Sequence, residues 1–182
     1  MRAIPFVALA ALLAGGCKKD EPEPAPPGPR AVAPRAAPCV YFKRLSPFLP
    51  SALPGYRTER DEGSSGKYGE VSVSEAERVF SKGERELSVR IVDTTVSDRL
   101  GEKIKAAARD ASSRPPTDPT APIFLGETVG FVRWDAGESK AEANLLVGDR
   151  FVVAVTGRGF EGTAEVREIA KSLDLAGLSK LR

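Results

Sequence analysis

The side chains of this 182-residue sequence that can do chemistry are mainly carboxylates and two cysteines, because the chain contains no histidine. Without histidine it cannot build Ser-His or Cys-His nucleophile pairs, or the histidine ligands of many zinc sites. Asp93, Glu127 and Asp135 stand at the ends of expected strands and are the candidates for paired catalytic carboxylates. Such acids are also ordinary solvated turn residues, and glycoside hydrolysis needs a fold-determined separation of about 5 to 9 Å. The sequence therefore assigns no catalytic residue.

A glycine-rich segment near the C-terminus, GRGFEG at 157–162, matches the bare G-x-G-x-x-G pattern of dinucleotide sites. The rest of that binding unit is missing, because the preceding strand is expected in an antiparallel meander and only twenty residues follow the third glycine. The sequence also lacks an Asp-rich calcium loop and a set of transition-metal ligands. We therefore expect no cofactor and no metal.

A third candidate site combines aromatic side chains with a cation. Trp134 and Arg133 stand in an expected strand, opposite a proline-rich loop at 112–122 that leads to Phe124. Trp134, Arg133 and Phe124 would line a ligand groove under that loop. A lone tryptophan in a strand is also typical of a hydrophobic core, so both interpretations stay open.

The strands that must position these residues are indicated by hydrophobic alternation. Apolar and polar residues alternate over 87–91 after a turn at 81–84, which is the pattern of a half-buried strand. Strands at 127–134, 141–147 and 151–157 are joined by turns too short for a parallel crossover. Further strands are expected at 56–60 and 68–80, with a break at the glycines and serines of 63–66.

Two main helices complete the expected fold. A narrow apolar stripe predicts a helix over 97–111, with Thr95 and Asp98 as its capping box, and Thr163 caps a final helix. A short helix is expected within 41–49. The sequence thus predicts an α+β domain with a mostly antiparallel sheet of about five to six strands. The order of elements is similar to the Mog1/PsbP-like folds, a resemblance that implies an architecture and no site.

The N-terminus has the form of a secretory signal. Residues 1–16 combine a positive start with an apolar stretch too short to span a bilayer comfortably. The following LAGGC, at 13–17, resembles the lipobox of bacterial lipoprotein precursors. This resemblance implies that Cys17 is lipidated and becomes the mature N-terminus. Because Lys18 and not Asp follows the cysteine, the resemblance implies the outer membrane, facing the periplasm, more than the inner membrane.

Residues 17–38 are expected to form a tether, because seven prolines fall within 18–38 and favour extended polyproline II. The single globular domain is then 39–182, which has equal numbers of basic and acidic residues. Such a balance argues against a nucleic-acid partner. Cys39 is either a partly covered thiol or the site of an intermolecular disulfide.

These observations predict a membrane-anchored envelope lipoprotein with a non-catalytic domain that binds a protein or a cell-wall component. The lipid on Cys17 would hold it to the membrane. The alternative is a small-ligand-binding protein or an enzyme that uses loop 112–122 as a lid.

Overall fold

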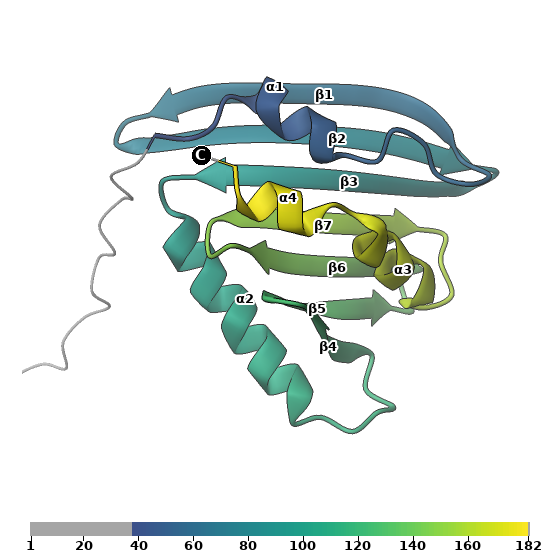
Figure 1. The fold of residues 1–182 in the computed structure, drawn as a ribbon. Helices are drawn as coiled ribbons and strands as arrows, with labels where there is room; N and C mark the ends of the chain where they lie inside the picture. Colours follow the sequence, from purple (N-terminus) through teal and green to yellow (C-terminus); the bar gives the residue numbers. More distant parts are fainter. Residues whose placement is uncertain (1–37, 182) are drawn as a thin grey trace, which may run out of the picture. The chain divides into compact units, whose positions relative to one another are not determined.

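The computed structural model describes residues 38–181, so the predicted signal at 1–16 and all of the predicted tether except Pro38 lie outside the described residues. The seven strands are β1 (Arg57–Tyr68), β2 (Val71–Lys82), β3 (Arg85–Thr94), β4 (Thr120–Leu125), β5 (Thr128–Asp135), β6 (Lys140–Val147) and β7 (Phe151–Arg158). The helices are α1 (Phe42–Leu45), η1 (Ser46–Phe48), α2 (Ser97–Ser112), α3 (Ala164–Ser172) and α4 (Leu175–Ser179). All strands pair antiparallel, in the order β1-β2-β3-β7-β6-β5-β4 (Figure 1).

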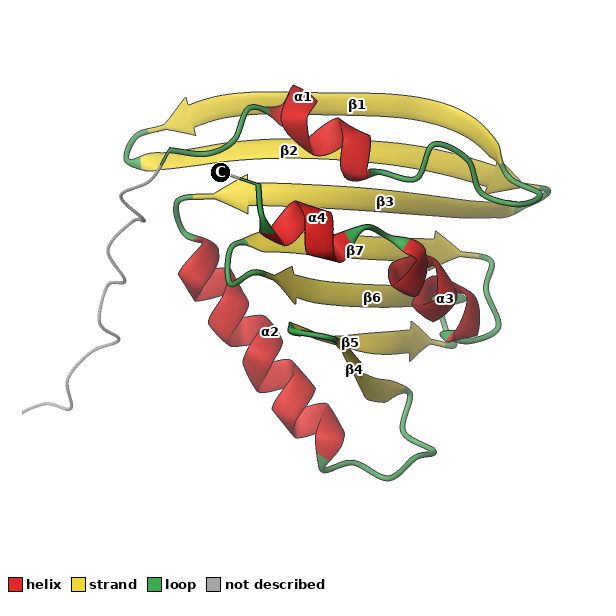
Figure 2. Ribbon diagram, in the orientation of Figure 1, coloured by secondary structure: helices red, strands yellow, loops and turns green. Residues whose placement is uncertain are grey.

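The two faces of the sheet are covered differently. The face that we call the core face packs against α1, η1, α3 and α4, which lie over the sheet in Figure 2. Its fully buried side chains include Phe80, Leu87 and Phe151. The opposite face, which we call the second face, is covered by α2, where Gly101 lies against the side chain of Leu146. Among the strands, α2 makes its main contacts with β4 to β7, so it leaves most of the second face of β1, β2 and β3 uncovered.

The predicted α+β class and antiparallel sheet are confirmed, but the sheet has seven strands and not five to six. The additional strand is β4, which the sequence assigned to the end of a long loop. Its Pro122 lies opposite Phe131 of β5. Proline is tolerated there because β4 is an edge strand, where an amide proton is not needed on the outer side.

The predicted break at 63–66 is wrong, because β1 continues through both glycines. The ring of Phe42 covers Gly63 so closely that an added Cβ would lie 2.2 Å from its Cδ2 atom, and the ring of Tyr68 lies over Gly66. Aromatic side chains thereby supply the packing that the glycines lack. Ser65 strengthens the pairing, because its hydroxyl lies 2.7 Å from that of Ser74 on β2.

The predicted long helix is present as α2, but its predicted capping box is wrong. The Thr95 hydroxyl accepts a hydrogen bond from the Ser72 amide at 3.0 Å, so it binds the neighbouring strand and not the helix. Val96 occupies the N-cap position. Thr163 does stand at the N-cap of α3, although its side chain makes no capping hydrogen bond.

A buried ion pair joins the centre of the sheet to the start of the domain. Asp93, at the end of β3, is fully buried and accepts hydrogen bonds from Arg150, whose nitrogens lie 2.7 and 3.2 Å from its two oxygens. The same carboxylate accepts a hydrogen bond from the Val40 amide at 2.7 Å. Arg150 also donates a hydrogen bond to the Pro38 carbonyl at 3.2 Å. One pair of charges therefore fixes both β7 and the first described residues.

We predict that Asp93→Ala lowers the free energy of unfolding by about 3 to 5 kcal/mol, because it leaves the Arg150 guanidinium buried without its carboxylate. Urea denaturation measures the loss, and hydrogen exchange at Val40 should rise with it. Glu168→Ala is the control, since Glu168 forms an exposed pair with Lys171 and its removal should change stability little. Equal effects of the two substitutions would contradict the role given to Asp93.

Candidate functional site

The three acids singled out in the sequence have separate surroundings. Asp93 is bound to Arg150, as described above. Asp135 closes a turn by accepting the amides of Gly137 and Glu138 at 2.9 and 3.1 Å. Glu127 is exposed in the turn before β5, at the end of that strand opposite Asp135. The eight residues between those ends span roughly 25 Å, so Glu127 and Asp135 are too far apart to act as a pair.

The glycines of the GRGFEG segment are explained by packing. Gly157 lies in β7, and an added Cβ would lie 2.5 Å from the ring of Phe160. Gly159 has a φ of 76°, a conformation that favours glycine where the chain leaves the strand. The carbonyl of Phe160 accepts the indole N–H of Trp134 at 3.3 Å. The segment therefore folds Phe160 back onto the sheet.

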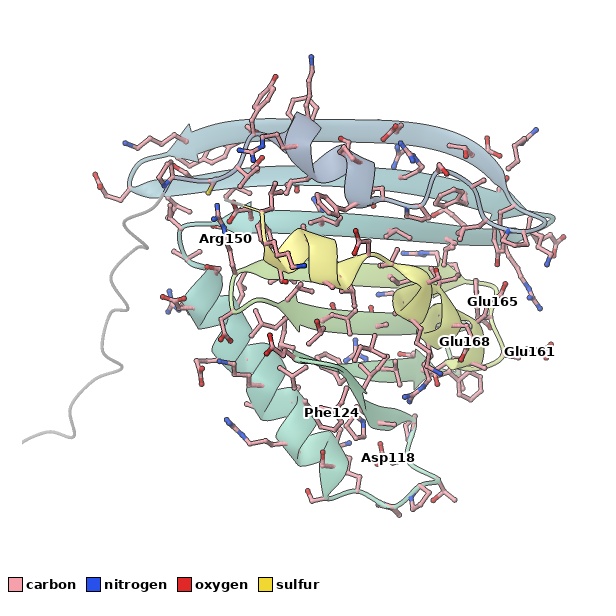
Figure 3. The ribbon with its side chains drawn as sticks, in the orientation of Figure 1. Asp118, Phe124, Arg150, Glu161, Glu165 and Glu168 are labelled. Carbon is pink, nitrogen blue, oxygen red and sulfur yellow. The ribbon has the colours of Figure 1, made fainter. Side chains whose placement is uncertain are left out.

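Two of the three residues of the predicted groove border one hollow. Arg133 and Trp134, at the end of β5, line a surface hollow of about 640 Å³ together with Thr117 and Pro119 of the proline-rich loop. Phe124 does not line it. Its side chain is 62% exposed on β4, and Figure 3 labels it together with Asp118 of the loop.

The proline-rich loop is tied to the strands beside it. The carbonyl of Pro119 accepts a hydrogen bond from the backbone amide of Trp134 at 2.9 Å. The Asp118 carboxylate accepts one from the amide of Thr120 at 2.8 Å. Arg114 also forms ion pairs with Asp110 and Asp118. These contacts hold the loop as one wall of the hollow.

A second hollow, which no pattern in the sequence indicates, runs beside α2. We call it the α2 groove. It has a volume of about 350 Å³, and its apolar part is formed by Leu100, Ile104 and Ala107 of α2 with Phe131 and Val152 of the sheet. Leu100 is 36% exposed, which is unusual for a large apolar side chain of a helix that packs on a sheet. Arg133 borders both hollows.

The polar rim of the α2 groove is dominated by cations. Glu142 accepts a hydrogen bond from Arg133 at 2.8 Å and pairs with Lys140. Burial opposes ionisation of Glu142, but Lys140 and Arg133 outweigh it and hold the pKa of this carboxyl below its ordinary value. Lys103 is exposed at the same groove. The lining of the groove thus holds two cations, Lys103 and Arg133, and one carboxylate, Glu142, which leaves the rim positive.

A third polar cluster joins the N-terminal segment to α3. The Tyr56 hydroxyl donates to Glu165 at 2.8 Å, and Arg85 forms an ion pair with the other oxygen of Glu165 at 3.2 Å. Burial of the phenol, followed by its hydrogen bond to Glu165, raises the pKa of Tyr56 to about 12. Because Tyr56 follows the segment of α1 and η1, this cluster fixes that segment against α3.

The raised pKa of Tyr56 gives a measurable pH dependence. Since it is above the ordinary value of 10.0, the stability from this contact is fully present below pH 10 and is lost as the pH rises through about 12. Ultraviolet titration of tyrosinate should show a component near pH 12 that Tyr56→Phe removes. Tyr41→Phe, at a residue 53% exposed, should leave that component in place. Loss of the component in the Tyr41 variant would show that it was wrongly assigned to Tyr56.

Two further properties concern the described part of the chain. Between residues 38 and 181, no three or more cysteine, aspartate or glutamate side chains gather as a metal site would require. No helix in this range has the length and apolar character needed to cross a membrane. Comparison of the chain with protein-family models, curated protein sequences and solved structures finds no match.

Proposed function

We propose that this chain is a lipid-anchored protein of the bacterial cell envelope whose domain binds another envelope protein through the α2 groove. The observation that carries the proposal is the groove itself, in which Leu100, Phe131 and Val152 form an accessible apolar surface beside a positive rim. Such a surface fits a partner segment that inserts an apolar side chain and presents a carboxylate to Lys103 and Arg133.

The anchor in this proposal is Cys17, within the lipobox-like segment. The proline-rich residues between it and the domain have a maximum reach of roughly 65 Å, at about 3.1 Å per residue. The domain would then search a thin layer next to the membrane, which raises its effective concentration toward partners in the same layer. At this higher effective concentration, a contact of low affinity in the α2 groove is sufficient for the domain to bind its partner.

A second candidate is a small-molecule site in the hollow beside Trp134. It is favoured by the combination of Trp134, Arg133 and Thr117 around about 640 Å³. The partially exposed indole and the guanidinium suit a flat or anionic ligand. The two candidates differ in the residues that a bound molecule must touch, apart from the shared Arg133.

The anchor is tested by Cys17→Ser in the full chain, which should move the protein from the membrane fraction to the soluble fraction because no lipid can be attached. Circular dichroism should be unchanged, since Cys17 lies outside the domain. Cys39→Ser is the matched control and should stay with the membrane. Retention of the Cys17 variant in membranes would contradict the lipid anchor.

The groove is tested by placing a photo-crosslinking amino acid at Leu100 or at Phe124 of the membrane-anchored protein in cells. Both are exposed apolar residues, but only Leu100 lines the α2 groove. We expect one recurrent protein to be captured from position 100 and not from 124, through a peptide with apolar and acidic residues. Arg133→Glu should reduce this capture about tenfold by reversing the charge of the rim.

Other outcomes of this experiment contradict the proposal. Capture of cell-wall glycan, or equal capture from both positions, would exclude specific protein binding in the α2 groove. Binding of a small molecule that quenches Trp134 fluorescence, without a protein captured at 100, would favour the hollow beside the proline-rich loop instead.

A further inference from the structure

The two edges of the sheet are protected to different degrees. At one edge, β4 has six residues and contains Pro122, which cannot donate a backbone hydrogen bond. At the other edge, β1 has twelve residues without proline, all exposed except the half-buried Gly66. Among the described residues, β1 pairs with β2 on one side and with no strand on the other, so this other side presents backbone amides and carbonyls to a further strand.

The two halves of β1 also differ. The first half carries charges at nearly every position from 57 to 62 and a register shift between Thr58 and Arg60, and both features discourage edge pairing. The second half, 63–68, has the sequence GSSGKY with Lys67 as its single charge. Its centre, 63–66, therefore lacks the charged side chains that discourage edge pairing.

We propose that β1 pairs antiparallel with β1 of a second copy, with the two-fold axis at Ser64, so that two sheets join into one. In an antiparallel pair, residues directly opposite share a face of the sheet. A centre at Ser64 places Asp61 opposite Lys67 on the core face and Arg60 opposite Tyr68 on the second face. Because the two-fold axis repeats each pair, the interface contains two Asp61–Lys67 charge pairs. It also contains two contacts between the Arg60 cation and the exposed ring of Tyr68.

Neighbouring registers are less favourable. A centre at Asp61 or Glu62 would bring two identical carboxylates opposite each other, which is destabilising. A centre at Ser65 would leave Lys67 opposite Gly63, without a charge partner. Of these registers, only the one centred at Ser64 places a carboxylate opposite Lys67. This inference is independent of the α2 groove, because α2 packs over the half of the sheet that ends in β4.

The test is disulfide formation in membranes that contain the full chain, with Cys39→Ser introduced so that the domain has one new thiol. Residues opposite each other on paired strands have Cβ atoms about 4.5 to 5.5 Å apart, close to disulfide distance. Ser64→Cys should therefore give a crosslinked dimer under mild oxidation. Ser113→Cys, at an exposed serine beyond α2, should not.

Charge exchange tests the register. Lys67→Asp should lower the Ser64→Cys crosslinked fraction about tenfold, because two attractive pairs become repulsive. Adding Asp61→Lys to the same chain should restore it, and thermal unfolding checks that each variant is folded. Equal crosslinking at positions 64 and 113, a dimer unaffected by Lys67→Asp in the folded protein, or a purified lipidated chain that is monomeric by light scattering in detergent would each overturn the proposal.

Discussion

The buried pair of Asp93 and Arg150 is the interaction on which the arrangement of this domain depends. β3 and β7 are the two strands that join the halves of the sheet, and Asp93 lies opposite Phe151 where they meet. Burying two charges is costly, and such a pair persists only when its hydrogen bonds are satisfied. Here the Val40 amide donates a hydrogen bond to Asp93, and Arg150 donates one to the Pro38 carbonyl. The start of the domain is therefore part of the centre of the sheet.

How much of the fold can be predicted from the sequence depends on the range of the interactions. The alternation in β3 and the stripe in α2 are local patterns, and both elements were predicted close to their observed bounds. The continuity of β1 at Gly63 depends on Phe42, which is twenty-one positions away and belongs to another element. β4 was hidden by Pro122, which is acceptable only because the strand lies at an edge.

The same distinction holds for the candidate sites. Trp134 and Arg133 are neighbours in sequence at the end of one strand, so a local pattern is enough to consider them together, and the structure places both beside the proline-rich loop. The α2 groove combines a helix with β5, β6 and β7. Tertiary packing decides which face of the sheet α2 covers. The sequence of α2 shows only that one side of the helix is apolar. The partner of Asp93 is Arg150, which lies fifty-seven residues away, and for the same reason the sequence did not predict this pair.

The position of the first described residues has a mechanical consequence. A force applied to the chain at Pro38 acts on the hydrogen bonds that link Pro38 to Arg150 and Val40 to Asp93. Through these bonds the force reaches the sheet at β3 and β7. These are interior strands with a hydrogen-bonded neighbour on each side, so the load is shared across the sheet. The peripheral strand β1 and the α2 groove lie off this line of force. While these hydrogen bonds hold, such a pull is applied to the interior of the sheet and not to its edge.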